Sequence, residues 1–339
     1  MQTFGLTAAV EDPRISARKV FSLISNELLL VEEEFERQAK SNIQVIAFIG
    51  EYLRASGGKR VRPALCLLSN YAVGGNGSTM RSIRMATVME FLHTATLVHD
   101  DIIDNAETRR NRSSVNSRFG NQTAVLMGDW LYMSAFETSL GERSLEILDI
   151  LTRVTRKMTE GELIQLTMLG RTDIDETKYF DILQRKTAHL FSACCEIGGI
   201  MGNQNKNYQE ALRDYGLYLG TAFQLVDDLL DFTADEEVLG KAAGADLLEG
   251  KVTLPLIKLL EKKKDARSIL QRIMHDGTYK NASREGLLEM LNETGAIEET
   301  RKRAYEYAEA ARDSIEILPE SEYRNALMSL PSYIIERKG

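Results

Sequence analysis

Residues 79–104 read "TMRSIRMATVMEFLHTATLVHDDIID", and this stretch decides the fold class because it joins a long apolar helix to an acidic end. Its apolar residues recur at three- and four-residue spacing, which is typical of a helix that packs in a core. The stretch ends in Asp100, Asp101 and Asp104. Carboxylates one helical turn apart repel each other, so this ending predicts either a solvated acidic patch or a bound cation.

Helical periodicity of the same kind runs through almost the whole chain, whereas alternating strand patterns are scarce. Only five prolines occur in 339 residues, so long helices meet few breaks. No change in composition marks a linker or a second domain. We therefore expect one all-α domain over residues 1–339, a helical bundle of ten or more helices. The clearest helical stretches are residues 15–39, 42–56, 64–73, 79–104, 123–140, 143–170, 177–202 and 207–233.

Bulk composition narrows the class of protein further. A hydrophobic content of 43% and a mean hydropathy of −0.24 suit a globular protein with a large core. The formal net charge of −8 argues against a broad nucleic-acid-binding surface. Three cysteines, two of them adjacent, do not make a disulfide framework. Without a signal-peptide pattern or a transmembrane segment, we expect a cytoplasmic protein.

The acidic ending at residues 99–104, "HDDIID", recurs at residues 226–231 as "VDDLLD". Both copies have the form D-D-x-x-D, and each follows a long apolar helix. Positions i and i+4 of a helix share a face, so each motif presents an acidic edge. Hard divalent cations bind such oxygens, and magnesium shares its shell with substrate phosphates. One motif alone would be an ordinary solvated patch, but two favour Mg²⁺ ions with an anionic substrate between them.

Basic residues flank both acidic motifs in an otherwise acidic protein. The stretch "GGKRVRP" (57–63) places three cations beside glycines that allow a ligand to approach the backbone. Guanidinium groups match phosphate oxygens, so cations around two acidic edges favour phosphate sites over ordinary surface charge. The other flanking cations are Arg109, Arg110, Lys186, Lys241 and Lys251.

At this point the chain resembles the trans-polyprenyl diphosphate synthases, which are head-to-tail prenyltransferases of isoprenoid synthesis. The matching pieces cover about residues 50–260 in the family's order. They are "GGKRVRP", "FLHTATLVHDDIIDNAETRR", "GDWL", "KTAHL", "FQLVDDLLDFTAD" and "GKAAGADLLEGKVTLPLI". The resemblance implies an all-α bundle of the isoprenoid synthase type around a central apolar cavity, formed as a homodimer. It also implies Mg²⁺ as cofactor, three ions with substrate bound, with Mn²⁺ able to substitute.

The resemblance also implies roles for individual residues. The expected metal ligands are Asp100, Asp101, Asp104, Asp227, Asp228 and Asp231. The expected site for isopentenyl diphosphate is Gly58, Lys59, Arg62, His93 and Arg110. The expected site for the allylic diphosphate is Arg109, Lys186, Thr187, Gln224, Lys241 and Lys251. The residues expected to carry the catalysis are Asp100, Asp101, Lys186, Asp227 and Lys241. The stretch "RRNRSSVN" (109–116) departs from the family's usual glycine and lysine-proline continuation, which leaves the conformation of loop 111–116 open.

The implied reaction is ionisation of an allylic diphosphate such as farnesyl diphosphate, helped by the metal and the cations. The double bond of isopentenyl diphosphate then attacks the allylic cation. In this reading the departing diphosphate takes the proton, so the reaction requires no catalytic histidine.

Product length depends on how deep the apolar cavity runs before the first acidic motif. The positions four and five residues before Asp100 are Thr96 and Ala95, and both are small, whereas bulky aromatics there shorten the product in similar enzymes. With Leu92 and Met89 further along, we predict an octaprenyl-type product, from hexaprenyl to decaprenyl. Replacing Ala95 by phenylalanine should shorten it. Alternatively, the small residues serve only close helix packing.

Three other functions compete with a long-chain synthase. A geranylgeranyl or farnesyl diphosphate synthase would use the same motifs with a shallower cavity. A terpene cyclase would need neither a second D-D-x-x-D motif nor "GGKRVRP". A non-catalytic subunit would be expected to lack some of these charged residues, although an intact catalytic subunit of a hetero-oligomeric synthase stays possible. A long apolar product also suggests transient membrane contact during its release.

Overall fold

The computed structural model describes residues 13–109, 112–203, 205–234 and 244–336, and over these residues the protein is all-α, as predicted. The helices are α1 (Pro13–Ser22), α2 (Ser25–Ala39), α3 (Gln44–Ala55), α4 (Val61–Ala72), α5 (Met80–Ile103), α6 (Val115–Phe119), α7 (Asn121–Leu140), α8 (Leu145–Met168), α9 (Glu176–Leu183), the π-helical turn η1 (Gln184–Ala188), α10 (His189–Gly202), α11 (Lys206–Thr233), α13 (Ala245–Leu248), α14 (Leu254–Lys262), α15 (Ala266–Asp276), α16 (Arg284–Glu293), α17 (Ala296–Ser314) and α18 (Glu322–Ile335). One short antiparallel hairpin, β1 (Thr108–Arg109) with β2 (Arg112–Ser113), interrupts them.

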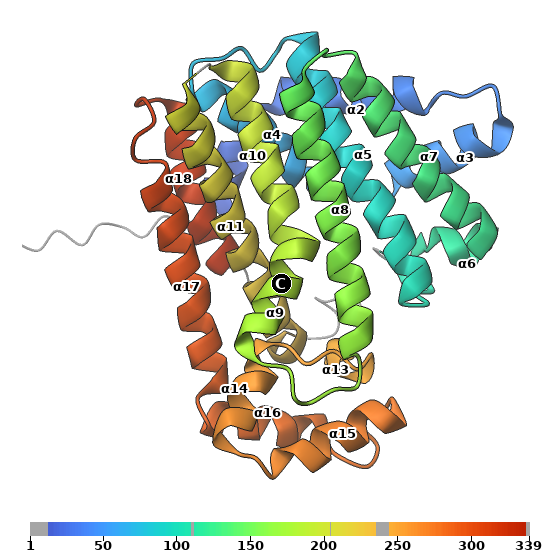
Figure 1. Ribbon diagram of the computed structural model, residues 1–339, viewed down its shortest axis with the longest axis vertical. Helices are drawn as coiled ribbons and strands as arrows, with labels where there is room; N and C mark the ends of the chain where they lie inside the picture. The colour runs from blue at the N-terminus through green and yellow to red at the C-terminus, as the bar shows by residue number, and fades with distance from the viewer. Residues whose placement is uncertain (1–12, 110–111, 204, 235–243, 337–339) are drawn as a thin grey trace, which may run out of the picture.

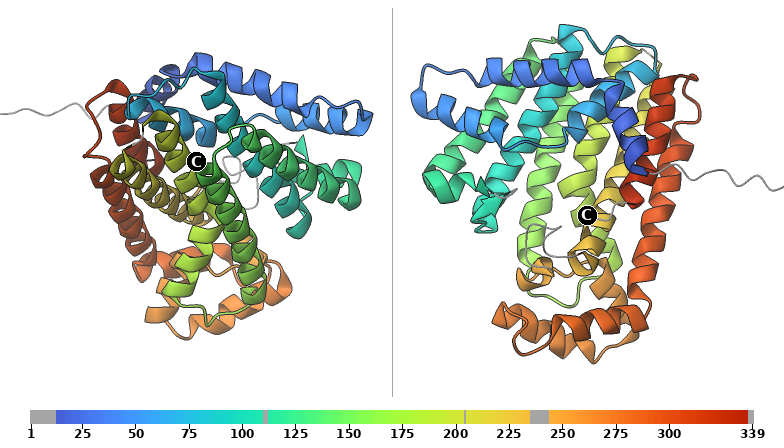
Figure 2. Two further views of the ribbon diagram at one scale, coloured as in Figure 1. Left: turned by 45° about the horizontal axis from the view of Figure 1, so that its top comes forward. Right: turned by 180° about the vertical axis from the view of Figure 1, so that it is seen from behind.

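The long helices α4, α5, α8, α10 and α11 run side by side in the centre of the molecule (Figure 1). Helix α5 packs against α4 and α7, while α11 packs between α10 and α17. Figure 2 shows α2 and α3 crossing one end of this bundle, and α14, α15 and α16 lying at the opposite end. Both acidic motifs end helices of the central bundle, and Asp101, Asp228 and Asp231 are buried whereas Asp104 is exposed.

Three glycines allow the central helices to approach closely. A Cβ atom added at Gly216 would lie 2.5 Å from the carbonyl oxygen of Phe191, and one at Gly220 would lie 2.7 Å from the Cα of Ala188. A Cβ atom at Gly198 would lie 2.2 Å from the carbonyl oxygen of Cys66. Real Cβ contacts are longer, so these positions bring α11 close to both η1 and α10, and α10 close to α4.

The structure differs from the sequence-based expectation in two helices. Residues 15–39, expected as one helix, form α1 and α2 with a break at residues 23–24. Helix α1 packs on α18 and α2 packs on α5, and the break lets Val20 and Ile24 both be buried. Residues 177–202 form one helical run as expected, but a π-helical turn interrupts it at Gln184–Ala188. Tertiary packing, which a periodicity pattern does not encode, produces both differences.

The loop that departs from the family pattern has a defined conformation where the structure describes it. Ser114 precedes α6, and its hydroxyl accepts a hydrogen bond from the backbone N–H of Ser117, which is an ordinary N-cap. The side chain of Asn116 donates to the carbonyl oxygens of Asp101 and Ala106. The segment is therefore attached to the end of α5 by hydrogen bonds.

None of the described helices combines the length and the apolar composition that a membrane span requires. The three cysteines, Cys66, Cys194 and Cys195, are buried and not bridged.

Candidate active site

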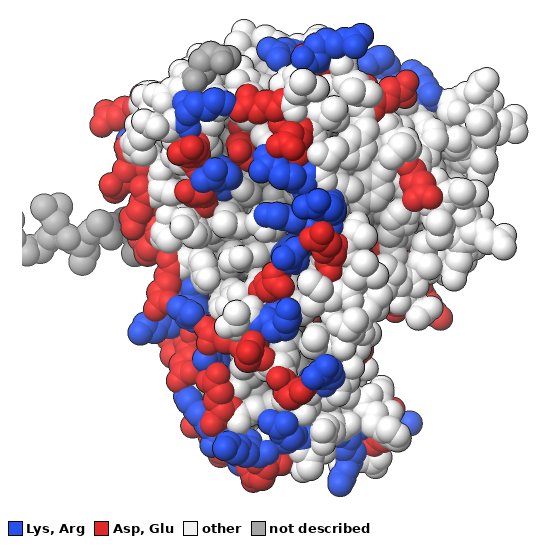
Figure 3. All heavy atoms as spheres, in the orientation of Figure 1, with Lys and Arg blue, Asp and Glu red and all other residues white. Residues whose placement is uncertain are grey.

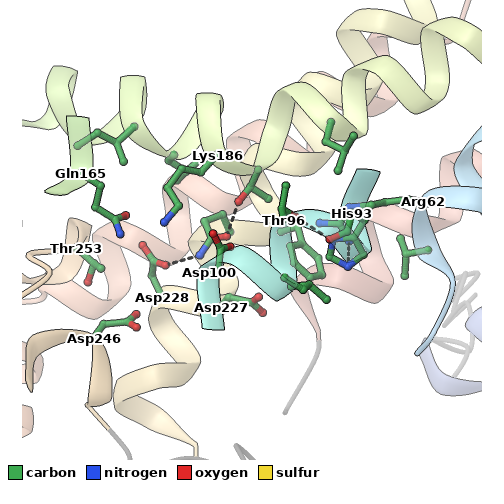
Figure 4. Close-up of a pocket in the computed structure, with 18 of the residues that line it drawn as sticks. Arg62, His93, Thr96, Asp100, Gln165, Lys186, Asp227, Asp228, Asp246 and Thr253 are labelled. Atoms are coloured by element: carbon green, nitrogen blue, oxygen red, sulfur yellow. Dashed lines mark hydrogen bonds between the residues drawn. The ribbon is translucent and has the colours of Figure 1, made fainter. Parts of the chain in front are cut away.

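A cavity of about 870 Å³ opens between the two acidic motifs. It is lined by Asp100 from the end of α5 and by Asp227 and Asp228 from α11, together with basic residues that include Arg62 and Lys186 (Figure 4). The close-up shows Asp100 and Lys186 pointing toward the two α11 carboxylates across the cavity. The two copies of the motif therefore contribute to a single site.

The middle acid of each motif is held by protein groups. Asp101 is buried, and both Nε and Nη2 of Arg109 lie 2.7 Å from its Oδ1 atom. Asp228 is also buried; Tyr179 donates to its Oδ2 at 2.5 Å and Gln224 donates to its Oδ1 at 2.9 Å. These contacts orient the two motifs so that the preceding acids, Asp100 and Asp227, line the cavity.

The third acid of each motif contacts the segment that follows α11. The Lys251 ammonium lies 3.2 Å from Oδ1 of Asp104 and 2.6 Å from Oε2 of Glu249. Asp231 is buried, and its Oδ2 atom accepts a 3.3 Å hydrogen bond from the backbone N–H of Asp246. Segment 244–251 therefore contacts the ends of both motifs, and its residues Asp246, Gly250 and Lys251 line the cavity.

The site is electrostatically unusual because several carboxylates lie away from water. Burial raises the pKa of Asp100 to about 6, and the nearby ammonium of Lys186 partly offsets that rise. Burial also raises the pKa of Asp228 well above its usual value, and the negative charge of Asp246 adds to the effect. A site that penalises uncompensated negative charge in this way attracts cations.

The π-helical turn η1 carries Lys186 and Thr187 into the cavity. Such turns insert one extra residue into a helix and often mark functional sites. The turn presses against Gly161 of α8, where an added Cβ atom would lie only 2.7 Å from the Cβ of Arg185. The Lys186 ammonium lies 2.5 Å from Oε2 of Glu162, and the Thr187 hydroxyl donates to Oε1 of Gln224 at 2.9 Å.

The glycine-rich stretch 57–63 forms another wall of the cavity. Gly57 has a φ angle of 69°, a conformation that favours glycine, and Gly58, Lys59 and Arg62 line the cavity after it. Arg62 Nη1 lies 3.0 Å from Nε2 of His93. Because a guanidinium group only donates, His93 accepts through Nε2 and carries its proton on Nδ1. The Arg62 guanidinium also lies 5.0 Å from the ring centre of Phe191.

The residues predicted to set the cavity depth do not all reach the cavity. Thr96 lines it, one turn before Asp100 on α5. Ala95, Leu92 and Met89 are fully buried in the core and are not among the lining residues. The role predicted for these four residues stays a prediction.

Most of the predicted site residues therefore come together. Those that line the cavity are Gly58, Lys59, Arg62, His93, Thr96, Asp100, Arg109, Lys186, Thr187, Gln224, Asp227, Asp228 and Lys251. Asp101, Asp104 and Asp231 reach the site through the contacts described above. Arg110 and Lys241 lie outside the described residues.

Sequence reasoning missed several polar residues of the cavity. Gln165 lines it one turn after Gly161 on α8, and a lone amide in the apolar run "LIQL" (163–166) was the available signal. Tyr179 also lines the cavity, but nothing in its local sequence predicts a contact with Asp228, 49 residues away. The others include Glu90, Asp246 and Thr253, whereas Arg60, one of the three cations of the stretch 57–63, lines the cavity as well.

The donor set suits a divalent cation that shares its shell with a phosphate group. Among the residues that the structure describes, no three His, Cys, Asp or Glu side chains converge into a complete metal site. Magnesium, however, usually takes one or two carboxylates from the protein and the remaining oxygens from water and substrate phosphates. Asp100 and Asp227 on the cavity wall, with Asp104 one turn beyond Asp100, can supply such a partial shell.

Comparisons with known proteins agree with this geometry. The family model described as polyprenyl synthetase matches residues 43–291. The chain is 38% identical over 326 residues to the octaprenyl diphosphate synthase of Escherichia coli K12, covering 95% of this chain and 99% of that one. It is 34% identical to an all-trans-nonaprenyl-diphosphate synthase of Rhodobacter capsulatus, covering 94% and 97%. A polyprenyl synthase from Caulobacter crescentus CB15, solved with calcium and isoprenyl diphosphate, superposes with a TM-score of 0.89 at 33% identity, covering 95% and 98%.

Proposed function

The chain belongs to the polyprenyl synthetase family, and we propose that it adds isopentenyl diphosphate units head to tail to an allylic diphosphate to make a long-chain all-trans polyprenyl diphosphate. It is therefore a transferase. The single observation that carries the proposal is the convergence of two D-D-x-x-D motifs and their flanking cations on one cavity. The near full-length similarity to octaprenyl and nonaprenyl diphosphate synthases supports a long product.

The cavity offers two groups of basic and polar residues, which suit two diphosphates. We assign the allylic diphosphate to the group between the acidic motifs, namely Arg109, Lys186, Thr187, Gln224 and Lys251, with Lys241. We assign isopentenyl diphosphate to the group at the glycine-rich stretch, namely Gly58, Lys59, Arg62 and His93, with Arg110. The described members of both groups line the same cavity, so the allylic carbon and the attacking double bond would meet inside it.

Divalent metal is the cofactor of this reaction, and we propose Mg²⁺, with three ions when substrate is bound and Mn²⁺ able to substitute. Asp100, Asp104 and Asp227 would hold it, while Asp101 and Asp228 orient the motifs through Arg109 and Tyr179. Asp231 would support the second motif through the backbone of Asp246. When bound, the metal stabilises the negative charge that develops on the diphosphate as the C–O bond breaks.

Side chains of the protein would bind the diphosphate and exclude water. Lys186 and Arg109 would bind the departing diphosphate and neutralise its charge. Apolar side chains from α9, α10 and α11, including Leu183, Leu190 and Leu219, would keep water from the allylic cation. His93 accepts a hydrogen bond from Arg62. In this proposal the departing diphosphate takes the proton, and no histidine acts as the base.

The reaction can be tested directly with purified protein. We would supply Mg²⁺, labelled isopentenyl diphosphate and farnesyl diphosphate, and then size the dephosphorylated products. The expected result is a ladder that ends at one prenol of hexaprenyl to decaprenyl length. A product no longer than geranylgeraniol would support a short-chain synthase instead. The absence of product from any allylic primer would point to a missing partner subunit or to a protein without this activity.

We also propose that the protein forms a homodimer through α7. Leu126, Met133 and Leu140 recur every seven residues on this helix, so they share one face, and they are 68%, 61% and 52% exposed. Figure 3 shows a broad region with few charges on the side of the molecule that carries α7. Exposed apolar patches of this kind favour association. Light scattering should give twice the chain mass, and Met133→Glu should shift it toward the monomer.

The remaining sequence-based expectations stand as proposals. They are a single domain over residues 1–339, a cytoplasmic location, no nucleic-acid partner and transient membrane contact when the apolar product is released.

A further inference from the structure

The side chain of Arg60 is held between carboxylates from two different helices. Its Nη1 atom donates to Oε1 of Glu90 on α5 at 2.7 Å, and its Nε and Nη2 atoms donate to the carboxylate of Glu32 on α2. The side chain of Arg60 is only 12% exposed, and that of Glu90 is 5% exposed. A buried guanidinium group with two carboxylate partners has a fixed geometry, because each N–H bond is directional.

The backbone of Arg60 has a conformation that needs such support. Its φ and ψ angles are 48° and 38°, in the left-handed region, directly before α4 begins at Val61. Residues other than glycine rarely adopt this conformation, and it persists where the surrounding structure enforces it. Lys59 precedes Arg60 and Arg62 follows two residues later, and both line the cavity. The direction of these two cations therefore depends on the conformation of Arg60.

Helix α5 holds this stretch at two points one turn apart. Glu90 contacts Arg60, and His93, three residues later on the same face, contacts Arg62 at 3.0 Å. All four residues line the main cavity. Figure 4 shows the second of these contacts, with Arg62 and His93 directed toward each other.

The positive charge of Arg60 is neutralised by its two carboxylate partners, so its role differs from that of Lys59 and Arg62. Two carboxylates contact its single positive charge, so it adds little net attraction for a diphosphate. Buried ion pairs often contribute more to a specific geometry than to stability. A paired charge, a buried side chain and a left-handed backbone together fit a residue that orients Lys59 and Arg62.

We propose that Arg60 and Glu90 are positioning residues for isopentenyl diphosphate, which hold Lys59 and Arg62 in the geometry that binds its phosphates. The inference rests on the proposed function and adds two residues to it. In this proposal the ion pair acts through Lys59 and Arg62, because it sets the stretch 57–63 against α5. Weakening the pair should therefore affect isopentenyl diphosphate much more than the allylic substrate.

The test compares Glu90→Gln and Arg60→Lys with the wild-type protein and with Glu34→Gln. Glu34 is a matched control, because it is a buried carboxylate on α2 that contacts Arg37 but does not line the cavity. Initial rates would be measured with each substrate varied while the other is saturating, and thermal unfolding would verify the fold. We expect the KM for isopentenyl diphosphate to rise about tenfold or more in both cavity variants. The KM for the allylic substrate should change less than about twofold, and the control should change neither.

A graded third variant sharpens the result. Glu32 is 31% exposed and more accessible to water than Glu90, so Glu32→Gln should raise the KM for isopentenyl diphosphate less than Glu90→Gln does. Folded variants with an unchanged KM for isopentenyl diphosphate would overturn the proposal, and so would an equal rise in both KM values. Failure of the proposed function would look different, because the wild-type protein itself would then form no product.

Discussion

Lys251 and Asp104 are 147 residues apart in the sequence, yet the Lys251 ammonium lies 3.2 Å from Oδ1 of Asp104. The contact joins the end of α5 to the segment after α11, and Glu249 is the second partner of the lysine. Burial opposes a charged lysine here, but Asp104 and Glu249 raise the pKa of Lys251 above its usual value. The ammonium group therefore occupies a cation position beside an expected metal ligand.

Replacing Lys251 by methionine should affect both stability and catalysis. The change leaves Asp104 without this cation, so the free energy of unfolding of the metal-free protein should fall by about 1 kcal/mol. It also removes a charge assigned to the allylic diphosphate, so kcat/KM for that substrate should fall about a hundredfold. Chemical denaturation and steady-state kinetics would measure the two effects. Lys302→Met, at an exposed lysine of α17, is the control, and an equal loss of activity there would contradict the assignment.

Tyr179→Phe should lower the rate while keeping the fold. The substitution removes the 2.5 Å hydrogen bond to Asp228 and leaves that buried carboxylate with Gln224 as its remaining side-chain donor in the contacts described above. We expect kcat to fall about tenfold and the free energy of unfolding to fall by about 1–2 kcal/mol. Tyr215→Phe is the matched control, because Tyr215 is also buried and donates to the carbonyl oxygen of Leu327. Loss of stability without loss of kcat is expected in the control, and the same pattern in Tyr179→Phe would refute the positioning role.

Gly161→Ala should disturb the π-helical turn that carries Lys186. The added methyl group would lie 2.7 Å from the Cβ of Arg185 and 3.2 Å from the backbone nitrogen of Lys186, so the turn must move. Because a small displacement of a catalytic group slows the reaction strongly, kcat should fall by about tenfold or more. Gly286→Ala on α16 tests whether any helical glycine has this effect, since its added Cβ would lie 3.2 Å from the Ser283 hydroxyl. Wild-type activity in Gly161→Ala would mean that the position of the turn is not critical.

Stability at mildly acidic pH should depend on His189. Burial, together with the positive charges of the nearby Lys157 and Arg185, lowers the pKa of His189 to about 4. Because the unfolded state binds the proton near pH 6.5, stability from the neutral ring is present above that pH and is lost as the pH falls toward 4. When the pH falls from 7 to 5, protonation of this group should lower the free energy of unfolding by about 1 kcal/mol, allowing for its partial exposure.

His189→Gln should remove that part of the pH dependence, since glutamine can still accept a hydrogen bond from Lys157 but does not titrate. Denaturation at several pH values would measure the difference between the variant and the wild-type protein. His275→Gln is the control, because His275 is 88% exposed. Parallel stability curves for the wild-type protein and His189→Gln would show that the ring is not kept neutral by its surroundings.

The helical fold and most of the candidate site could be predicted because both depend on short sequence patterns, namely apolar spacing and charged motifs. Helix α5 and its acidic end could be predicted from apolar spacing within a single 26-residue stretch. The second motif could be paired with the first because both have the pattern D-D-x-x-D. The repeated pattern therefore predicts one site for Asp100 and Asp227, and both line the same cavity.

What the sequence did not predict depends on contacts between distant segments. Tyr179 and Asp228 are 49 residues apart, and Arg60 and Glu90 are 30 residues apart, with no periodic relation between the members of either pair. The π-helical turn at Lys186 lies inside an apolar helix and depends on packing against Gly161. Such features arise from tertiary structure, which local propensity does not determine.

The depth of the cavity gives the last prediction, and the structure separates two residues that the sequence treated alike. Thr96 lines the cavity one turn before Asp100, whereas Ala95 is fully buried in the core. Thr96→Phe should therefore narrow the cavity directly and shorten the product, as sized by chromatography of the prenols. Ala95→Phe was expected from the sequence to shorten the product too, but its ring must first displace core neighbours, at a cost of about 1–3 kcal/mol in stability. Thr155→Phe, on α8 away from the lining residues, controls for added bulk. If Thr96→Phe leaves the product length unchanged while Ala95→Phe shortens it, the growing chain passes through the core beside α5 rather than along the face that carries Thr96.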